Sequence, residues 1–184
     1  DCSWSRGLGD VYKRQAPDDP RLGNFPIVFL HGRSSFKFSS EERQALADYL
    51  SDEVQGFVIA DAICGNREFA TSLRKEFADL IPGARWERIP DNHPLMSDRY
   101  RGFDLSKVSL RRPERSSDDV ATFRETQTSP VLEGLWIDGR LAVVFSPYDL
   151  SCALENGNSL ECVGYSADDA QRIGINILLY ALQM

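Results

Sequence analysis

The sequence predicts an α/β domain in which helices cover both faces of a mostly parallel sheet. Two continuous apolar runs, residues 26–30 and 57–60, are typical of strands that are buried on both faces. A helical pattern follows each run, and strands that alternate with helices favour a parallel sheet. A hairpin at the Asp138–Gly139 turn adds an antiparallel pair, which we expect at the edge of this sheet.

The helices are predicted from their start signals. Ser39 and Glu42 form a capping box in front of an amphipathic stretch that ends near residue 50. Asn66 is the expected N-cap of a second helix, and Ser166 begins the last one. Residues 84–89 alternate in polarity and predict a third, shorter strand.

Residues 95–130 are polar, and the sequence predicts an irregular excursion there. The charged run 111–115 within it is interpreted as a solvated loop.

Size and charge limit the function classes. The 184 residues are 42% hydrophobic and 27% charged, which is typical of one globular domain. The formal net charge of −7 argues against a nucleic-acid partner. Because no apolar run approaches the roughly 18 residues that a membrane span needs, we expect no span within this chain.

Residues 1–15 look foreign to the domain. They lack an initiator Met and any helical or strand periodicity, and they resemble translated sequencing adapter at the ends of metagenomic gene models. We therefore predict a non-native tail at 1–15 and a single domain at 16–184. A gene that begins in adapter is also expected to lack its own N-terminal part.

Polar residues follow the predicted strands where each one ends. Open α/β sheets bind ligands outside the carboxyl ends of their strands, so these residues predict a binding rim. The rim residues are His31, Gly32, Arg33, Asp61, Gly65, Asp91, Ser146, Tyr148 and Asp149. We expect the partner to be an unknown small ligand or a protein.

Cys64 is a candidate nucleophile because it lies between a buried strand and a helix, where nucleophile elbows occur. His93 or His31 is the candidate base. The alternative is a small buried thiol, and the residues around Cys64 are larger than those of a typical elbow.

Two further interpretations concern metals and the other cysteines. The spacing of His31, Asp61, His93 and Asp149 matches no metal-ligand motif, so we expect no metal and no other cofactor. Cys152 and Cys162 flank a short loop, and we predict a disulfide between them, which would place the domain outside the cytoplasm. The alternative is a pair of unpaired thiols.

Several strings occur in a characteristic order along residues 22–184. They are Phe29-Leu30-His31-Gly32-Arg33, Ala60-Asp61-Ala62, Cys64-Gly65, His93-Pro94-Leu95, Asp138-Gly139-Arg140-Leu141, Ser146-Pro147-Tyr148-Asp149-Leu150 and Ile173-Gly174-Ile175-Asn176. With these strings the chain resembles the domain of unknown function family 4159 (DUF4159), a class I glutamine-amidotransferase-like domain. The string at 146–150 is the most specific part of the resemblance.

The resemblance implies a flavodoxin-like, three-layer α/β/α fold and a bacterial protein with a secretion signal or membrane anchor upstream. It also implies a further strand and helix before Pro26, and we expect this unit to be missing here if residues 1–15 are adapter. Class I amidotransferases pair their Cys with a later His-x-Glu, but no His follows His93. We therefore expect a non-catalytic ligand- or partner-binding domain outside the cytoplasm. The alternative is a cysteine-dependent amidase or hydrolase that uses Cys64 with His93 or His31.

Overall fold

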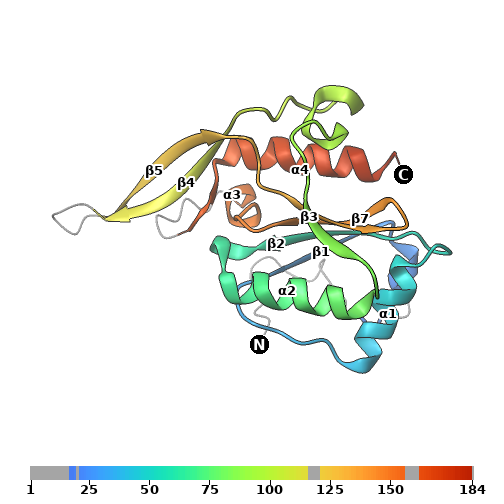
Figure 1. Cartoon of the computed structure of the whole chain (residues 1–184). Helices are drawn as coiled ribbons and strands as arrows, with labels where there is room; N and C mark the ends of the chain where they lie inside the picture. The colour runs from blue at the N-terminus through green and yellow to red at the C-terminus, as the bar shows by residue number, and fades with distance from the viewer. Residues whose placement is uncertain (1–16, 20, 116–120, 156–161, 184) are drawn as a thin grey trace.

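A five-stranded sheet lies at the centre of the protein, in the order β1-β2-β7-β6-β3 (Figure 1). Its strands are β1 (Ile27–Gly32), β2 (Phe57–Ala62), β3 (Arg85–Arg88), β6 (Glu133–Ile137) and β7 (Arg140–Ser146). The computed structural model describes residues 17–19, 21–115, 121–155 and 162–183, so the predicted foreign tail at 1–15 lies outside the described residues. In this part of the chain, four strands of the sheet point one way and β6 points the other way. The predicted α/β class with a mostly parallel sheet is confirmed.

The hairpin does not lie at the edge of the sheet, and this part of the prediction is wrong. Strand β7 pairs in parallel with β2, while β6 pairs with β7 on one side and with β3 on the other. Residues 141–145 are apolar and buried, which suits an interior strand, whereas β3 is short and mostly exposed, which suits an edge.

Helices cover both faces of this sheet. Helices α1 (Ser40–Leu50) and α2 (Arg67–Leu80) lie on one face, and α4 (Ala167–Ala181) lies on the other (Figure 1). The expected caps are present at all three N-termini. Ser39 and Glu42 form the capping box, the Asn66 side chain accepts from the amide of Phe69 at 2.8 Å, and the Ser166 hydroxyl caps α4.

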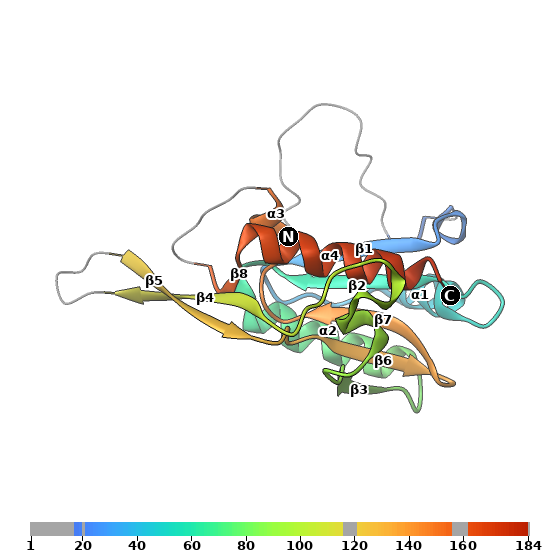
Figure 2. The ribbon, with the colours of Figure 1, turned by 90° about the horizontal axis from the view of Figure 1, so that it is seen from above.

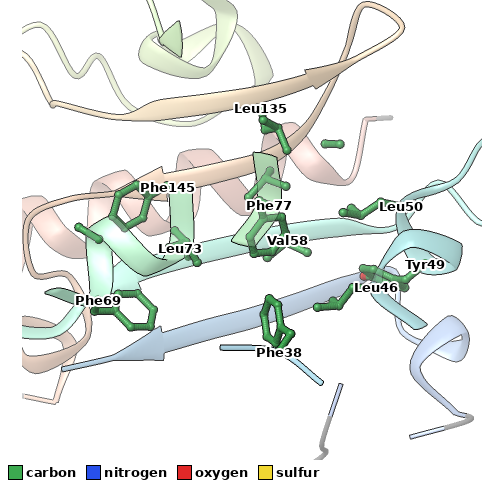
Figure 3. Packing of buried hydrophobic residues seen from close by; sticks show 14 of the residues in the cluster. Phe38, Leu46, Tyr49, Leu50, Val58, Phe69, Leu73, Phe77, Leu135 and Phe145 are labelled. Atoms are coloured by element: carbon green, nitrogen blue, oxygen red, sulfur yellow. The ribbon is translucent and has the colours of Figure 1, made fainter. Parts of the chain in front are cut away.

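Strand β2 divides the core in two, because its side chains alternate between the faces. Val58 and Ala60 pack among the large apolar side chains of α1 and α2, such as Phe77 (Figure 3). Phe57 and Ile59 pack on the opposite face against α4. Each fully buried Leu or Phe contributes about 1.5–3 kcal/mol, so the two clusters hold the sheet rigidly between its helices.

A second, antiparallel sheet occupies much of the segment that was expected to be irregular, and that prediction is wrong. Strands β4 (Val108–Arg115) and β5 (Ala121–Thr128) form a long hairpin, and the short β8 (Gly164–Tyr165) pairs with the base of β4. The hairpin projects beyond the main sheet in both views (Figures 1 and 2). Its outer part is exposed on both faces, so it lacks the apolar alternation that usually marks a strand.

Short helices complete the described elements. They are η1 (Leu22–Asn24), η2 (Ile63–Gly65), η3 (Pro94–Met96), η4 (Asp98–Tyr100) and α3 (Ser151–Leu154). The buried side chain of Asn176 donates to the carbonyls of Leu95, Ser97 and Phe103 and thereby ties η3 and η4 to α4. Within the described residues, no helix has the length and apolar character needed to cross a membrane.

Candidate ligand-binding site

Three of the predicted rim residues end neighbouring parallel strands at the same level. His31 on β1 is in register with Asp61 on β2, and Asp61 is in register with Ser146 on β7. These three residues form a continuous polar row across the carboxyl ends of three strands, as expected for an open α/β sheet.

Asp61 is fully buried and supports the segment that follows β7. Its carboxylate accepts hydrogen bonds from the amides of Leu150 and Ser151, at 2.9 and 3.1 Å, and from the Ser151 hydroxyl at 2.6 Å. These bonds cap the N-terminus of α3. Burial and the nearby Asp149 carboxylate raise the pKa of Asp61 to about 7.

Asp149, which is only 2% exposed, joins the segments around it. Its carboxylate accepts from the backbone amides of Cys64 and Cys152, the latter at 2.8 Å. Its own amide donates to the carbonyl of Val163 at 3.1 Å, and its carbonyl accepts from the amide of Tyr165 at 3.2 Å. One residue thus holds together η2, α3 and the chain that leads into β8.

The disulfide of the structure joins Cys64 to Cys162, which are 98 residues apart. The predicted bridge between Cys152 and Cys162 is therefore wrong, and Cys152 keeps a free thiol. The short spacing between Cys152 and Cys162 suggested the bridge, but the contacts of Asp149 bring Cys64 to the same place. Because the sulfur of Cys64 is bonded to Cys162, it is not a free nucleophile in this state.

The free thiol of Cys152 is held in its protonated form. Burial, a hydrogen bond to Asp149 and the surrounding carboxylates raise the pKa of Cys152 to about 12. Since the thiolate is the reactive species, this environment disfavours Cys152 as a nucleophile at neutral pH.

Two glycines allow the segments to approach each other closely. A Cβ on Gly164 would lie 2.7 Å from the Cβ and the carbonyl oxygen of Asp149. Gly65 has a φ of +66°, and a Cβ there would lie 3.2 Å from Val163. The site therefore requires glycine at both positions, and the sequence pattern had singled out only Gly65.

A small pocket opens beside the cysteines at this end of the sheet. It is lined by Arg111, Phe123, Asp149, Cys152, Ala153, Cys162, Gly164 and Tyr165. Arg111 and Phe123 come from the β4–β5 hairpin, and the Arg111 guanidinium lies 3.8 Å from the centre of the Phe123 ring. These two residues were missed because their segment was expected to be an irregular loop. The alternation of Val108, Ser109 and Leu110 was the available sign of a strand.

Other predicted rim residues lie near the carboxyl ends of the same strands and do not line this pocket. The Arg33 guanidinium lies 3.9 Å from the sulfur of Cys64, and the Tyr148 hydroxyl accepts from Arg112 at 3.0 Å. Gly32 packs against the Phe69 ring so closely that a Cβ would lie 2.5 Å from it. Burial lowers the pKa of His31, against the opposing effect of Glu155 and Asp149.

His93 and Asp91 do not join this group. The His93 ring lies 5.2 Å from the ring of Tyr180, which in turn lies 6.3 Å from the ring of Phe57 at the start of β2. Cys64 follows the other end of β2, and a strand of this length spans about 20 Å. The predicted Cys64–His93 pair is therefore not assembled. Asp91 is exposed and pairs with Arg88 at 3.3 Å.

None of the curated proteins compared with the chain matches it. A sequence profile of one family, the domain of unknown function DUF4159, matches residues 10–182. The match covers the strands of both sheets, the four α-helices and every residue of the pocket. The chain therefore belongs to the DUF4159 family.

Proposed function

We propose that this domain is a non-catalytic ligand- or partner-binding domain and that the pocket beside Asp149 is its binding site. The observation that carries the proposal is the gathering of the Asp149 carboxylate, a cationic side chain and aromatic rings around one opening. Ligand sites usually combine an apolar wall with a few polar groups that set orientation. The pocket also lies outside the carboxyl ends of parallel strands, where open α/β sheets bind their ligands, and this supports its role as a binding site.

The chemistry of the wall indicates the class of ligand. The Asp149 carboxylate is buried and accepts two backbone amides, and Arg111 adds a positive charge to the pocket wall. Phe123 supplies an exposed aromatic surface, and the buried Tyr165 also lines the pocket. A guanidinium beside aromatic rings suits a carboxylate attached to a planar apolar group, either on a small molecule or at the end of a peptide.

The alternative function, a cysteine-dependent amidase or hydrolase, has less support. Its nucleophile is in a disulfide and its candidate base His93 packs on Tyr180 at the other end of β2. A nucleophile and its base need to lie within hydrogen-bond reach.

Helices on both faces of the sheet favour a flavodoxin-like, three-layer arrangement related to class I glutamine amidotransferases, without the catalytic residues of those enzymes.

We place the domain outside the cytoplasm, in a periplasmic or membrane-associated bacterial protein. The disulfide between Cys64 and Cys162 supports this location, because such bonds persist in oxidising compartments.

A titration of the isotopically labelled protein with benzoate tests the proposed binding site. We expect saturable NMR shifts at residues that line the pocket, and weaker binding in Phe123→Ala. Phe103→Ala is the matched control, because Phe103 is about as exposed (40% against 39%) and also lies under an arginine. Benzamidine, which has the same shape and the opposite charge, is expected to leave the pocket unchanged. Absence of pocket shifts with benzoate, or equal affinity in Phe123→Ala, would overturn the proposal.

A further inference from the structure

We propose that the reduced protein binds a thiophilic divalent cation of the zinc class between Cys64, Cys152, Cys162 and Asp149. These four residues are called the cysteine cluster below. Three of them, Asp149, Cys152 and Cys162, also line the pocket, but cation binding does not depend on the proposed organic ligand.

The donor atoms of the cysteine cluster are close enough for one ion. The three sulfur atoms and a carboxylate oxygen of Asp149 all lie within 4.8 Å of one another. A tetrahedral zinc ion with bonds of about 2.3 Å to sulfur separates its ligands by about 3.8 Å. Side-chain rotations that move each donor atom by about an ångström are therefore enough to bring these four atoms to bonding distance from one ion. Three thiolates favour zinc over magnesium or calcium, and a carboxylate is also a zinc ligand.

The backbone already fixes the positions of these donors. Asp149 binds the amides of Cys64 and Cys152, and its main chain bonds to the residues that follow Cys162. Metal sites depend on such outer contacts to orient their ligands. The three cysteines are half-buried, and Cys152 and Cys162 line the pocket, which gives an ion a path from solvent.

The surrounding charges suit the complex. A divalent cation with three thiolates and one carboxylate carries two negative charges, which burial alone would make costly. The guanidinium of Arg33 lies 3.9 Å from the sulfur of Cys64, and Arg111 lines the adjoining pocket. Both arginines are placed to offset the excess negative charge.

The site is gated by oxidation, because the disulfide occupies two of the four donors. A dithiol breaks the bond between Cys64 and Cys162 by exchange, delivers two electrons and two protons to the two sulfurs, and is itself oxidised to a cyclic disulfide. The cation then binds three thiols and the Asp149 carboxylate, and three protons are released to solvent. Oxidation of Cys64 and Cys162 by a disulfide reverses the sequence and expels the ion.

Cobalt absorption tests this proposal in the full chain, in a Cys2→Ser background that leaves only the cysteines of the cluster. The protein is reduced with dithiothreitol, freed of it without oxygen, and titrated with Co²⁺. We expect one equivalent to produce thiolate-to-cobalt charge-transfer bands and the intense visible bands of tetrahedral cobalt, which Zn²⁺ then abolishes. The oxidised protein is expected to show neither set of bands.

Cys152→Ala is the decisive variant, because it leaves the disulfide intact and can be checked for folding in the oxidised state. If its oxidised form unfolds at the same temperature as the parent, the fold is retained. We then expect the reduced variant to lose about one third of the charge-transfer intensity and to bind Co²⁺ at least tenfold more weakly. Absence of tetrahedral cobalt bands in the reduced parent, or unchanged affinity and intensity in Cys152→Ala, would overturn the proposal.

Discussion

The carboxylate of Asp149 accepts a hydrogen bond from the backbone amide of Cys64, although 85 residues separate the two in the sequence. The same carboxylate accepts from the amide of Cys152, and the main chain of Asp149 bonds to Val163 and Tyr165. A single buried aspartate therefore positions every segment that carries a cysteine of the cluster. The disulfide joins two of these three segments, through Cys64 and Cys162.

Replacement of Asp149 by Ala is expected to lower the free energy of unfolding by about 2–4 kcal/mol. The reason is that two amides, those of Cys64 and Cys152, lose a charged acceptor in a buried place. Asp149→Asn should cost less, since its carbonyl oxygen can still accept one bond. Urea unfolding measures both values. Asp91→Ala is the matched control, because Asp91 is exposed, and it should stay within about 0.5 kcal/mol of the parent. Equal losses at Asp149 and Asp91 would contradict the central role of Asp149.

Gly164→Ala is expected to destabilise the protein by about 1–3 kcal/mol, because the added Cβ would lie 2.7 Å from two atoms of Asp149. Gly174 on α4 provides the comparison, since nothing lies within 4 Å of a Cβ at that position. Gly174→Ala should leave the free energy of unfolding unchanged or raise it by up to about 1 kcal/mol, as alanine favours a helix. Thermal unfolding measures the stability of both variants. A Gly164→Ala protein as stable as the parent would show that Gly164 does not lie this close to Asp149.

The raised pKa of Asp61 is expected to make the free energy of unfolding depend on pH. The pKa of an unperturbed aspartate is 3.8, and burial and the Asp149 carboxylate raise the pKa of Asp61 to about 7 in the folded protein. Between these two values the folded state holds a proton that the unfolded chain has released. The contribution of Asp61 to the free energy of unfolding therefore falls as pH rises through this window, and it is constant above about pH 7.

The variant Asp61→Asn isolates this effect, because an amide does not titrate. Urea unfolding between about pH 4 and about pH 8 should show the parent losing stability relative to the variant by a few kcal/mol as pH rises. A difference that stays constant, or a parent that gains relative stability with rising pH, would be inconsistent with a raised pKa at Asp61.

Local patterns predicted the parts of the fold that depend on neighbouring residues. The capping box at Ser39 and the N-cap at Asn66 are present, because a cap depends on the next few residues alone. The strand at 57–62 is buried along its whole length, in agreement with its apolar run. These features also made the row of His31, Asp61 and Ser146 foreseeable, since parallel strands bring their ends together.

Features that depend on distant partners were not predictable in the same way. The pairing of β7 with β2 is set by the packing of the whole sheet, so its hairpin was wrongly expected at the edge. Cys152 and Cys162 are close in sequence, but Asp149 also brings in Cys64 from a distant segment, and the disulfide joins Cys64 to Cys162. Arg111 reaches the pocket because β4 pairs with β8, a contact between segments that no local pattern links.

Mapping the disulfide of the oxidised protein tests the arrangement of the three cysteines most directly. Free thiols are alkylated at low pH, and the chain is cleaved after glutamate, which places Cys64, Cys152 and Cys162 in the separate peptides 54–68, 134–155 and 162–184. We predict a cross-linked pair of 54–68 with 162–184 and an alkylated Cys152. A cross-link between 134–155 and 162–184, with Cys64 alkylated, would contradict the arrangement around Asp149.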